Sequence, residues 1–224
     1  MNIILFGLPG SGKGTQADRL AERFGFLKVS TGDLLRAEIR SNSGLGKRIK
    51  PILARGDFPD TAIVNEAVLH FLQDHLQAPG FIFDGYPRTV EQAEFLGAIL
   101  ANFGQGLDLV VALDVDDAVL VERISGRIVC RDCQRGYHLK FAPPRESGVC
   151  DDCGGQDLQR RQDDTQETLE QRLAVYREKT LPVLEYYQDL GMLKRISGDA
   201  EIDEIAESLN QLVRLSTDTS SEVG

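Results

Sequence analysis

The feature that most constrains this chain is a glycine-rich loop that follows a short apolar run. Residues 1–6 read Met-Asn-Ile-Ile-Leu-Phe, and Gly-Leu-Pro-Gly-Ser-Gly-Lys-Gly-Thr follows at once. The apolar run predicts a buried strand, and the glycines allow the tight backbone curl that points successive N–H groups at phosphate oxygens. Lys13 can reach the outer phosphates, and a following helix directs its positive N-terminal end at the same anion. The pattern therefore predicts a nucleoside triphosphate site.

The context of the loop supports this interpretation over its alternative, an ordinary strand-to-helix turn. Apolar residues recur on one face of the helix expected over 14–24, and Gly25 is placed to end that helix. In the generic motif a hydroxyl residue follows the lysine directly. Here Gly14 follows it, and Thr15 comes one position later. This variant indicates a subgroup of phosphate-loop proteins.

The composition fits a globular enzyme and argues against some classes of partner. The 224 residues suffice for one sizeable core with appendages, and they are 42% hydrophobic and 27% charged. The net charge of −10 argues against a protein that coats nucleic acid or anionic membranes. No apolar stretch approaches the roughly 20 residues of a membrane span, and no secretory leader pattern precedes the loop. We therefore expect a cytoplasmic protein without nucleic-acid or membrane partners.

All four cysteines fall in one segment, with the spacing C-x2-C-x16-C-x2-C. Two such pairs can place four thiolates around one Zn2+, whereas two disulfides are disfavoured in a compartment that keeps thiols reduced. Iron also binds four thiolates, so the sequence leaves the metal open. His138 lies between the pairs and is an alternative ligand. The predicted ligands are Cys130, Cys133, Cys150 and Cys153.

Apolar runs alternate with helical patterns along most of the chain. This alternation predicts an α/β fold of P-loop NTPase type, with a five-stranded parallel sheet and helices on both faces. Phosphate sites in such sheets lie beyond the carboxyl ends of the strands. The expected strands are Ile3–Phe6, Leu27–Val29, Phe81–Phe83, Leu109–Leu113 and Met192–Ile196. Helices are expected at 14–24, 33–41, 61–76, 90–101, 117–125, 166–188 and 201–213.

Two stretches break the alternation and are expected to be insertions over the sheet edge. Residues 30–60 carry only helical and loop signals, and residues 127–163 are loop-rich and hold all four cysteines. The second stretch is too long for an unsupported loop, so a metal would supply its missing core. Residues 216–224 are expected to fray. The core domain is then formed by residues 1–29, 61–126 and 164–224.

Polar residues that suit phosphate chemistry follow the second and third expected strands. Asp84 ends the third strand, where a carboxylate can order Mg2+ or its water shell beside a phosphate loop; a cap or turn role is the alternative. The following Gly-Tyr-Pro-Arg-Thr fixes a rigid turn that presents Arg88. After the second strand, Ser30 and Asp33 resemble a helix-capping pair. Capping alone does not explain Arg36 one turn later, so the combination is more informative than either feature.

Lysine and arginine residues recur beside the expected phosphate-binding loops, although the chain as a whole is acidic. Arg123 and Arg127 lie four residues apart and share a helical face, while Arg161 and Arg172 flank an Asp-Asp pair. Because arginine binds phosphate bidentately and stays charged, the recurrence favours phosphate binding over a purely solubilising role. The set is Lys13, Arg36, Arg88, Arg123, Arg127, Arg161 and Arg172.

Four motifs resemble those of adenylate kinases in order and spacing. They are Gly-Leu-Pro-Gly-Ser-Gly-Lys-Gly-Thr-Gln, Ser-Thr-Gly-Asp-Leu-Leu-Arg, Asp-Gly-Tyr-Pro-Arg-Thr, and Gln-Asp-Asp-Thr followed by Arg172. The resemblance runs from Met1 to about Val213. It implies reversible transfer of the terminal phosphoryl group of MgATP to AMP, giving two ADP, in adenine nucleotide homeostasis and biosynthesis. It also implies that residues 30–60 bind AMP, that residues 127–163 form a long zinc-carrying lid, and that the protein is a monomer.

The resemblance further implies roles for individual residues. ATP would be bound by Gly10, Ser11, Gly12, Lys13, Gly14, Thr15, Arg123, Arg127, Gly136, Tyr137 and Ala200. AMP would be bound by Thr31, Arg36, Asp57, Phe58, Pro59, Gly85, Tyr86, Pro87, Arg88, Gln92, Arg161 and Arg172. Magnesium would be held through water by Asp84 and Asp33. The catalytic residues would be Lys13, Arg88, Arg123, Arg161 and Arg172.

A few positions depart from the family pattern. Asp57 brings a negative charge near an anionic ligand, and Phe58 changes the apolar wall beside the base. Tyr86 stands where phenylalanine is more usual. Ala200 lies where a backbone carbonyl commonly approaches adenine, so its side chain matters little there.

Three alternatives remain open at this point. A kinase for UMP, CMP or GMP is the nearest, and the long cysteine-bearing segment counts against it because those relatives usually have a short lid. A nucleotide-switched binding protein would not need the arginine set or the monophosphate motifs. A nucleic-acid-binding zinc ribbon at residues 130–153 fits poorly with an acidic chain.

Overall fold

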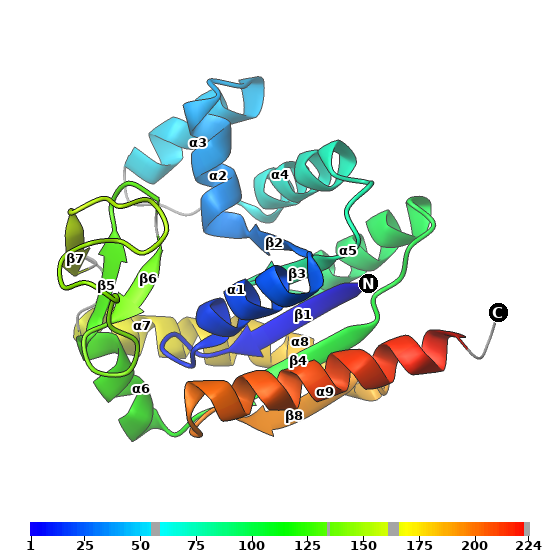
Figure 1. Cartoon of the computed structure of the whole chain (residues 1–224). Coiled ribbons are helices and arrows are strands. Elements are labelled where there is room, and N and C mark those ends of the chain that lie inside the picture. The colour runs from blue at the N-terminus through cyan, green and yellow to red at the C-terminus, as the bar shows by residue number, and fades with distance from the viewer. Residues whose placement is uncertain (55–58, 134, 161–165, 222–224) are drawn as a thin grey trace.

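A parallel sheet of five strands forms the centre of the computed structural model (Figure 1). The structure describes residues 1–54, 59–133, 135–160 and 166–221. The strand order is β2-β3-β1-β4-β8, which confirms the predicted sheet. The strands are β1 (Asn2–Gly7), β2 (Leu27–Ser30), β3 (Phe81–Asp84), β4 (Leu109–Asp114) and β8 (Leu193–Ser197).

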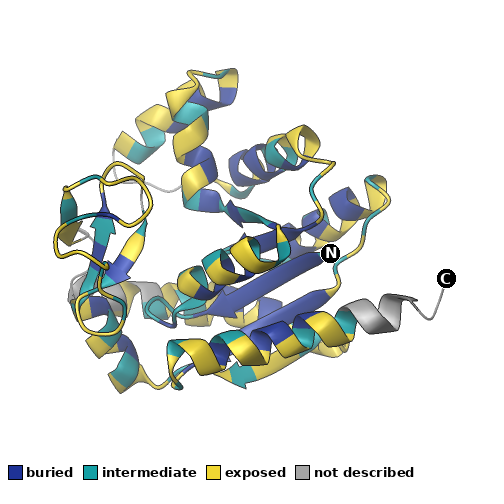
Figure 2. Cartoon of the chain, viewed as in Figure 1, coloured by how far each residue is buried: buried dark blue, intermediate teal, exposed yellow. Residues whose placement is uncertain are grey.

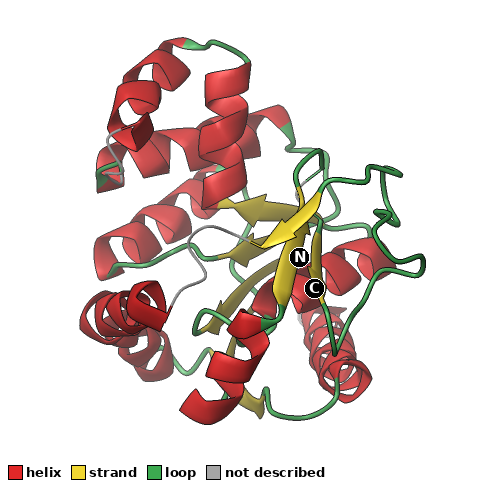
Figure 3. Ribbon diagram, turned by 90° about the vertical axis from the view of Figure 1, so that its left-hand side faces the viewer, coloured by secondary structure: helices red, strands yellow, loops and turns green. Residues whose placement is uncertain are grey.

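Helices lie on both sides of this sheet (Figure 3). The helix expected over 166–188 is interrupted by a π-helical turn, η1 (Tyr176–Thr180), and the last helix continues to Ser221 although fraying was expected from 216. Among the described residues, no helix is both long and apolar enough to cross a membrane. The helices are α1 (Lys13–Phe24), α2 (Thr31–Arg40), α3 (Gly44–Ala54), α4 (Thr61–Asp74), α5 (Val90–Asn102), α6 (Asp117–Ser125), α7 (Gln166–Val175), α8 (Leu181–Asp189) and α9 (Ile202–Ser221).

Side chains of the strands alternate between two apolar layers, as the pleat of a strand requires. On one face, Ile3 and Leu5 of β1 pack against residues of α1 and α9. On the other face, Ile4 and Phe6 pack against residues of α4, α5 and α8. Strand β1 is buried along its whole length (Figure 2), so the loop that follows it is anchored in the centre of the molecule.

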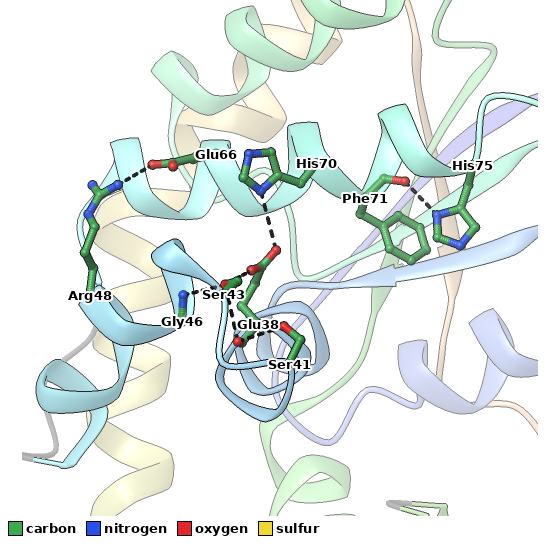
Figure 4. Close-up of polar contacts among 9 residues, drawn as sticks. All are labelled: Glu38, Ser41, Ser43, Gly46, Arg48, Glu66, His70, Phe71 and His75. Atoms are coloured by element: carbon green, nitrogen blue, oxygen red, sulfur yellow. Dashed lines mark hydrogen bonds and ion pairs between the residues drawn. The ribbon is translucent and has the colours of Figure 1, made fainter.

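The first insertion contains two helices joined by a tight, hydrogen-bonded connection (Figure 4). Ser43 precedes α3, and its Oγ accepts a hydrogen bond from Gly46 N at 2.8 Å. The same hydroxyl hydrogen-bonds to the carboxylate of Glu38 on α2. The sequence patterns do not predict helix α3 as a separate helix, because two glycines and Pro51 interrupt its apolar periodicity.

Polar side-chain contacts tie this insertion to α4, which begins directly after it (Figure 4). His70 Nδ1 of α4 lies 3.5 Å from Glu38 Oε1, and Arg48 Nη1 of α3 lies 2.7 Å from Glu66 Oε2. Apolar contacts between the same helices belong to the larger of the two cores. Helices α2 and α3 therefore form one packed unit with α4.

The second insertion is a small antiparallel sheet of three strands, which stands apart from the central sheet in Figure 1. Its order is β6-β5-β7, with β5 at Arg127–Cys130, β6 at Gly136–His138 and β7 at Leu158–Arg160. The sequence patterns predicted loop here, because strands of three or four residues are too short to show an alternation.

Candidate functional site

The phosphate loop lies between β1 and α1, as the sequence predicts. Gly10 and Gly12 have φ of 88° and 86°, a left-handed conformation that glycine adopts without steric cost. Among the described residues, no side chain caps the N-terminus of α1, and its first turn carries no acidic residue. The N–H groups and positive dipole at this end are therefore suited to an anion such as a phosphate group.

Helix α6 packs closely against the phosphate loop at Gly10. A Cβ at Gly10 would lie 2.9 Å from Ile124 Cγ1 and 3.1 Å from the carbonyl oxygen of Leu120. Gly10 therefore serves two needs, the backbone turn and the close approach of α6. Because α6 leads directly into β5, the helix that packs against the phosphate loop also carries the second insertion.

Asp84 lies beside the first turn of α1, where a metal-ordering carboxylate is expected. The register of the sheet pairs it with Leu5 of β1, and its side chain is only 14% exposed. A Cβ at Gly14 would lie 3.4 Å from Asp84 Oδ2. The carboxylate thus reaches the helix turn that would hold the phosphates, which fits a role in ordering the magnesium of MgATP.

Lys28 of β2 is a neighbour of Asp84 that the sequence patterns did not identify. Its Nζ lies 3.9 Å from Asp84 Oδ2 and 2.7 Å from Asp18 Oδ1. The two strands are hydrogen-bonded neighbours in the sheet, although 50 residues of chain separate them. Strand order in the sheet, rather than any local motif, brings this cation to the site.

The first turns of α2, which begins directly after β2, carry a close ion pair at the same sheet edge. Arg36 Nη2 lies 2.5 Å from Asp33 Oδ1, and both side chains are about half exposed. Burial acts to raise the pKa of Asp33, but the hydrogen bond and charge of Arg36 hold that pKa below its usual value. Ser30 stands at the N-cap position without a capping side-chain bond, and Thr31 is buried at the start of α2.

The loop after β3 is a rigid turn held by hydrogen bonds within the motif. Gly85 has a φ of 76°, and its carbonyl oxygen accepts a hydrogen bond from Arg88 Nε at 2.9 Å. Arg88 N donates to Gln92 Oε1 at 2.7 Å, and Thr89 Oγ1 accepts from Gln92 N at 3.2 Å. These bonds leave the Arg88 side chain exposed and Gln92 buried beside it.

Tyr86 points away from this turn into the core. Its side chain is 1% exposed, and its hydroxyl donates to Asn65 Oδ1 of α4 at 2.8 Å. Burial raises the pKa of this phenol. Pro87 follows through a cis peptide bond and is also buried, as is Pro59 at the end of the first insertion. The structure thus gives Tyr86 a packing role at the position predicted for AMP contact.

Arg123 connects α6 to the loop that follows β8. Its Nη1 donates to the carbonyl oxygen of Gly198 at 2.6 Å, and its Nη2 donates to that of Ala200 at 3.4 Å. Arg127 begins β5 opposite His138 of β6. Both arginines therefore lie where the central sheet passes into the second insertion.

Some predicted site residues fall outside the described residues. Asp57, Phe58 and Arg161 are among them, so their predicted contacts stay predictions. Arg172 lies on α7, whose backbone is described, but its side chain is not.

The four cysteines come together in the second insertion, with Sγ atoms that all lie within 4.8 Å of one another. Cys130 and Cys153 are 3.6 Å apart at sulfur, and Cys133 and Cys150 are 3.5 Å apart. Four sulfurs bound to a tetrahedral zinc at about 2.3 Å are separated by about 3.8 Å, whereas a disulfide requires about 2.05 Å. The arrangement fits a four-thiolate metal site and contains no disulfide among the described residues.

Two neighbours of this cluster define its surroundings. His138 Nδ1 accepts hydrogen bonds from the backbone N–H of Lys140 and Phe141, so this histidine is not part of the sulfur cluster. Tyr137 is buried against the cluster, and burial raises the pKa of its hydroxyl to about 12. Burial acts to raise the pKa of Cys150, but hydrogen bonds from Tyr137 and backbone N–H groups lower it to about 6, which favours a thiolate.

These features share one edge of the sheet. The register pairs Asp84 at the end of β3 with Leu5 near the end of β1 and with Ser30 at the end of β2. The phosphate loop, the Asp33–Arg36 pair and the Arg88 turn therefore emerge side by side. A phosphate loop and further cationic turns at the carboxyl edge of a parallel sheet define a P-loop nucleotide-binding protein.

Comparison with known proteins identifies the family within this class. The adenylate kinase family model matches residues 5–192. An adenylate kinase of Novosphingobium aromaticivorans is 45% identical over 213 residues, which cover 95% of this chain and 99% of that protein. Adenylate kinases of Geobacillus sp. and Lactococcus lactis are 43% and 41% identical over 214 residues, covering 95% of this chain and 98% and 100% of those proteins. The chain belongs to the adenylate kinase family, which confirms the family predicted from the motifs and makes it a nucleoside monophosphate kinase.

Proposed function

We propose that the chain transfers the terminal phosphoryl group of MgATP reversibly to AMP, giving two ADP, and thereby serves adenine nucleotide homeostasis and biosynthesis. The observation that carries this proposal is the adjacency of two phosphate-type loops. The loop at residues 8–12 follows β1 and the Arg88 turn follows β3, and these strands are hydrogen-bonded neighbours. One loop suits the donor phosphates and the other suits an acceptor phosphate.

On the donor side, the phosphate loop and the start of the second insertion would hold ATP. Lys13 and the first-turn N–H groups of α1 neutralise the phosphates, and Asp84 orders the magnesium that arrives with ATP. Arg123 Nη2 donates to the carbonyl oxygen of Ala200, where adenine is proposed to bind. The proposed ATP residues are Gly10, Ser11, Gly12, Lys13, Gly14, Thr15, Arg123, Arg127, Gly136, Tyr137 and Ala200.

On the acceptor side, the first insertion and the Arg88 turn would hold AMP. Gln92 Oε1 already accepts from Arg88 N, so a contact of Gln92 with the base would use its Nε2 donor. The proposed AMP residues are Thr31, Arg36, Asp57, Phe58, Pro59, Gly85, Tyr86, Pro87, Arg88, Gln92, Arg161 and Arg172. Asp33, paired with Arg36, is proposed to assist Asp84 at the magnesium.

The reaction itself calls for positioning and charge neutralisation more than for a dedicated base. Lys13, Arg88, Arg123, Arg161 and Arg172 are the proposed catalytic residues, since each brings a fixed positive charge. The two insertions, residues 30–60 and 127–163, are proposed to close over the core formed by residues 1–29, 61–126 and 164–224. Closure would exclude water, which prevents hydrolysis of ATP in place of transfer.

We also propose that Zn2+ occupies the four-cysteine cluster as a structural ion. The sulfur spacing supports this, since it is close to that of a tetrahedral four-thiolate site. A thiolate site persists in a reducing compartment, which is consistent with a cytoplasmic protein. Metal analysis of the purified chain should find about one zinc per chain, and light scattering should find a monomer; iron in place of zinc would overturn the choice of metal.

The decisive test of the reaction is an assay of ADP formation from MgATP with AMP, GMP, UMP or CMP as acceptor. We expect AMP to be strongly preferred. A clear preference for a pyrimidine nucleotide would overturn the proposed acceptor while leaving the donor site intact.

The role of the phosphate loop is tested by Lys13→Met, which removes one cation from that loop. We expect kcat to fall by at least about 100-fold, because an electrostatic contact of this kind contributes several kcal/mol to the transition state. Lys194→Met is the matched control, since Lys194 is exposed on β8. Unchanged phosphoryl transfer in Lys13→Met would show that the enzyme site has been misassigned.

A further inference from the structure

Tyr137 occupies the middle of β6, where its side chain packs into the small core of the second insertion. It is 7% exposed and lies in one cluster with Ile128, Cys130 and Cys150. Side chains alternate along a strand, so Gly136 and His138 lie on the face of β6 opposite to Tyr137. The tyrosine side chain is thus directed at the sulfur cluster.

Among the described residues, the hydroxyl of Tyr137 has two hydrogen-bond neighbours, and both lie on the segment of the second cysteine pair. The backbone N–H of Asp151 donates to it at 2.7 Å, and Cys150 Sγ lies 3.3 Å from it. Both partners are on the turn that carries Cys150 and Cys153. A single phenol therefore contacts a predicted metal ligand and the backbone directly after it.

Donor and acceptor rules fix the direction of these two bonds. A phenol carries one O–H donor together with acceptor lone pairs. Because a backbone N–H can only donate, the oxygen of Tyr137 must accept from Asp151. The proton of Tyr137 is then available to Cys150 Sγ, which accepts a hydrogen bond most strongly as a thiolate.

We propose that Tyr137 is a positioning residue of the metal site: it donates a hydrogen bond to the Cys150 thiolate and holds the turn of the second cysteine pair through Asp151. Groups that hydrogen-bond to metal ligands orient those ligands and tune their affinity for the metal. This inference rests on the metal proposed above. It also implies that any nucleotide contact at residues 136 and 137 uses the backbone, because the phenol is engaged with the sulfur cluster.

The test is the variant Tyr137→Phe, which keeps the ring and removes the hydroxyl. Full-length protein loaded with zinc is mixed with an excess of a chromogenic chelator, and the rate of zinc transfer is followed. We expect release to be about 10- to 100-fold faster than from the unmodified chain. Tyr186→Phe on α8 is the matched control and should release zinc at the unmodified rate.

A merely structural role for the hydroxyl is distinguished by thermal unfolding with and without zinc. If Tyr137 acts on the metal site, the gain in Tm on zinc loading is smaller in Tyr137→Phe than in the unmodified chain. An equal Tm loss in loaded and metal-free protein would overturn the proposal, because it would reflect packing alone. Release at the unmodified rate would overturn it as well.

A spectroscopic measurement does not depend on the stability of the variant. Cobalt(II) bound to four thiolates gives charge-transfer absorption that responds to hydrogen bonds on the sulfur. We expect these bands to shift in Tyr137→Phe and to stay in place in Tyr186→Phe. If the unmodified chain binds neither zinc nor cobalt, the metal proposal itself fails. If both proteins bind metal in the same way, the metal proposal stands and only the role of Tyr137 is overturned.

Discussion

Gly46 lies where α2 and α3 approach each other, and the absence of a side chain permits that approach. A Cβ at this position would overlap the carbonyl oxygen and carbon of Glu38, which are backbone atoms of the facing helix. One helix must move to relieve this overlap, so we expect Gly46→Ala to lower the free energy of unfolding by about 1–3 kcal/mol. Chemical denaturation measures this loss, and KM for AMP should rise because the first insertion shifts.

Gly44→Ala is the matched control two residues earlier in the same helix. A Cβ at Gly44 would meet no heavy atom within 4 Å, and alanine is the better helix former by up to about 1 kcal/mol. We expect this variant to be as stable as the unmodified chain or slightly more stable. Equal destabilisation by the two substitutions would contradict the steric explanation.

Single residues were predictable where a local motif fixes them. The left-handed glycines of the phosphate loop, the carboxylate at Asp84 and the exposed Arg88 all follow from short stretches of sequence. Lys28 and the hydroxyl of Tyr137 were not predicted in their observed roles, because their partners are brought close by strand order and by the folding of the insertion. Such contacts between distant segments leave no local pattern.

At the scale of elements, the junction between α6 and the second insertion depends on His138. Its Nδ1 accepts hydrogen bonds from Lys140 N at 3.1 Å and Phe141 N at 3.0 Å, which requires an unprotonated nitrogen. The ring also lies against Gly126, where a side chain would overlap it. Burial lowers the pKa of His138, in agreement with a neutral imidazole.

This arrangement predicts a pH dependence of stability. The folded pKa of His138 lies below the unfolded value of about 6.5, so its contribution is present above that pH and is lost as pH falls through the folded pKa. Tm should therefore fall as the pH drops below about 6.5. In His138→Asn the amide oxygen can still accept from the N–H two residues on, without titrating, so the fall should be shallower. The same slope in both proteins would exclude His138 as its source.

The elements themselves were predictable in proportion to their length and burial. Strands β1, β3 and β4 are short, buried apolar runs, and all five central strands were found where expected. The strands of the second insertion have three or four residues each, and a helix interrupted by glycines and Pro51 does not show a clear period. The π-helical turn η1 was missed because α7 and α8 continue one helical pattern through it.

At the scale of the whole molecule, apolar burial is distributed unequally. The two faces of the central sheet carry large cores, whereas the described part of the second insertion has four buried residues with Leu158 packed against them. So small a cluster offsets little of the conformational entropy of ordering the segment, and the proposed metal would supply the missing stabilisation. The alternation of strands and helices could predict the central sheet, but only the paired cysteines signalled how the insertion is held together.

This inequality predicts that removal of the metal unfolds the second insertion selectively. In hydrogen exchange of zinc-loaded protein, backbone amides of β5 and β6 should be protected, and a chelator should abolish that protection while β1 and β4 keep theirs. Tm should fall, whereas the fold of the central sheet should persist, because its cores contain none of the four cysteines. Cys133→Ser should reproduce the effect without chelator, since it removes one of four ligands. Uniform loss of protection across both sheets would instead mean that the metal stabilises the whole molecule as one cooperative unit.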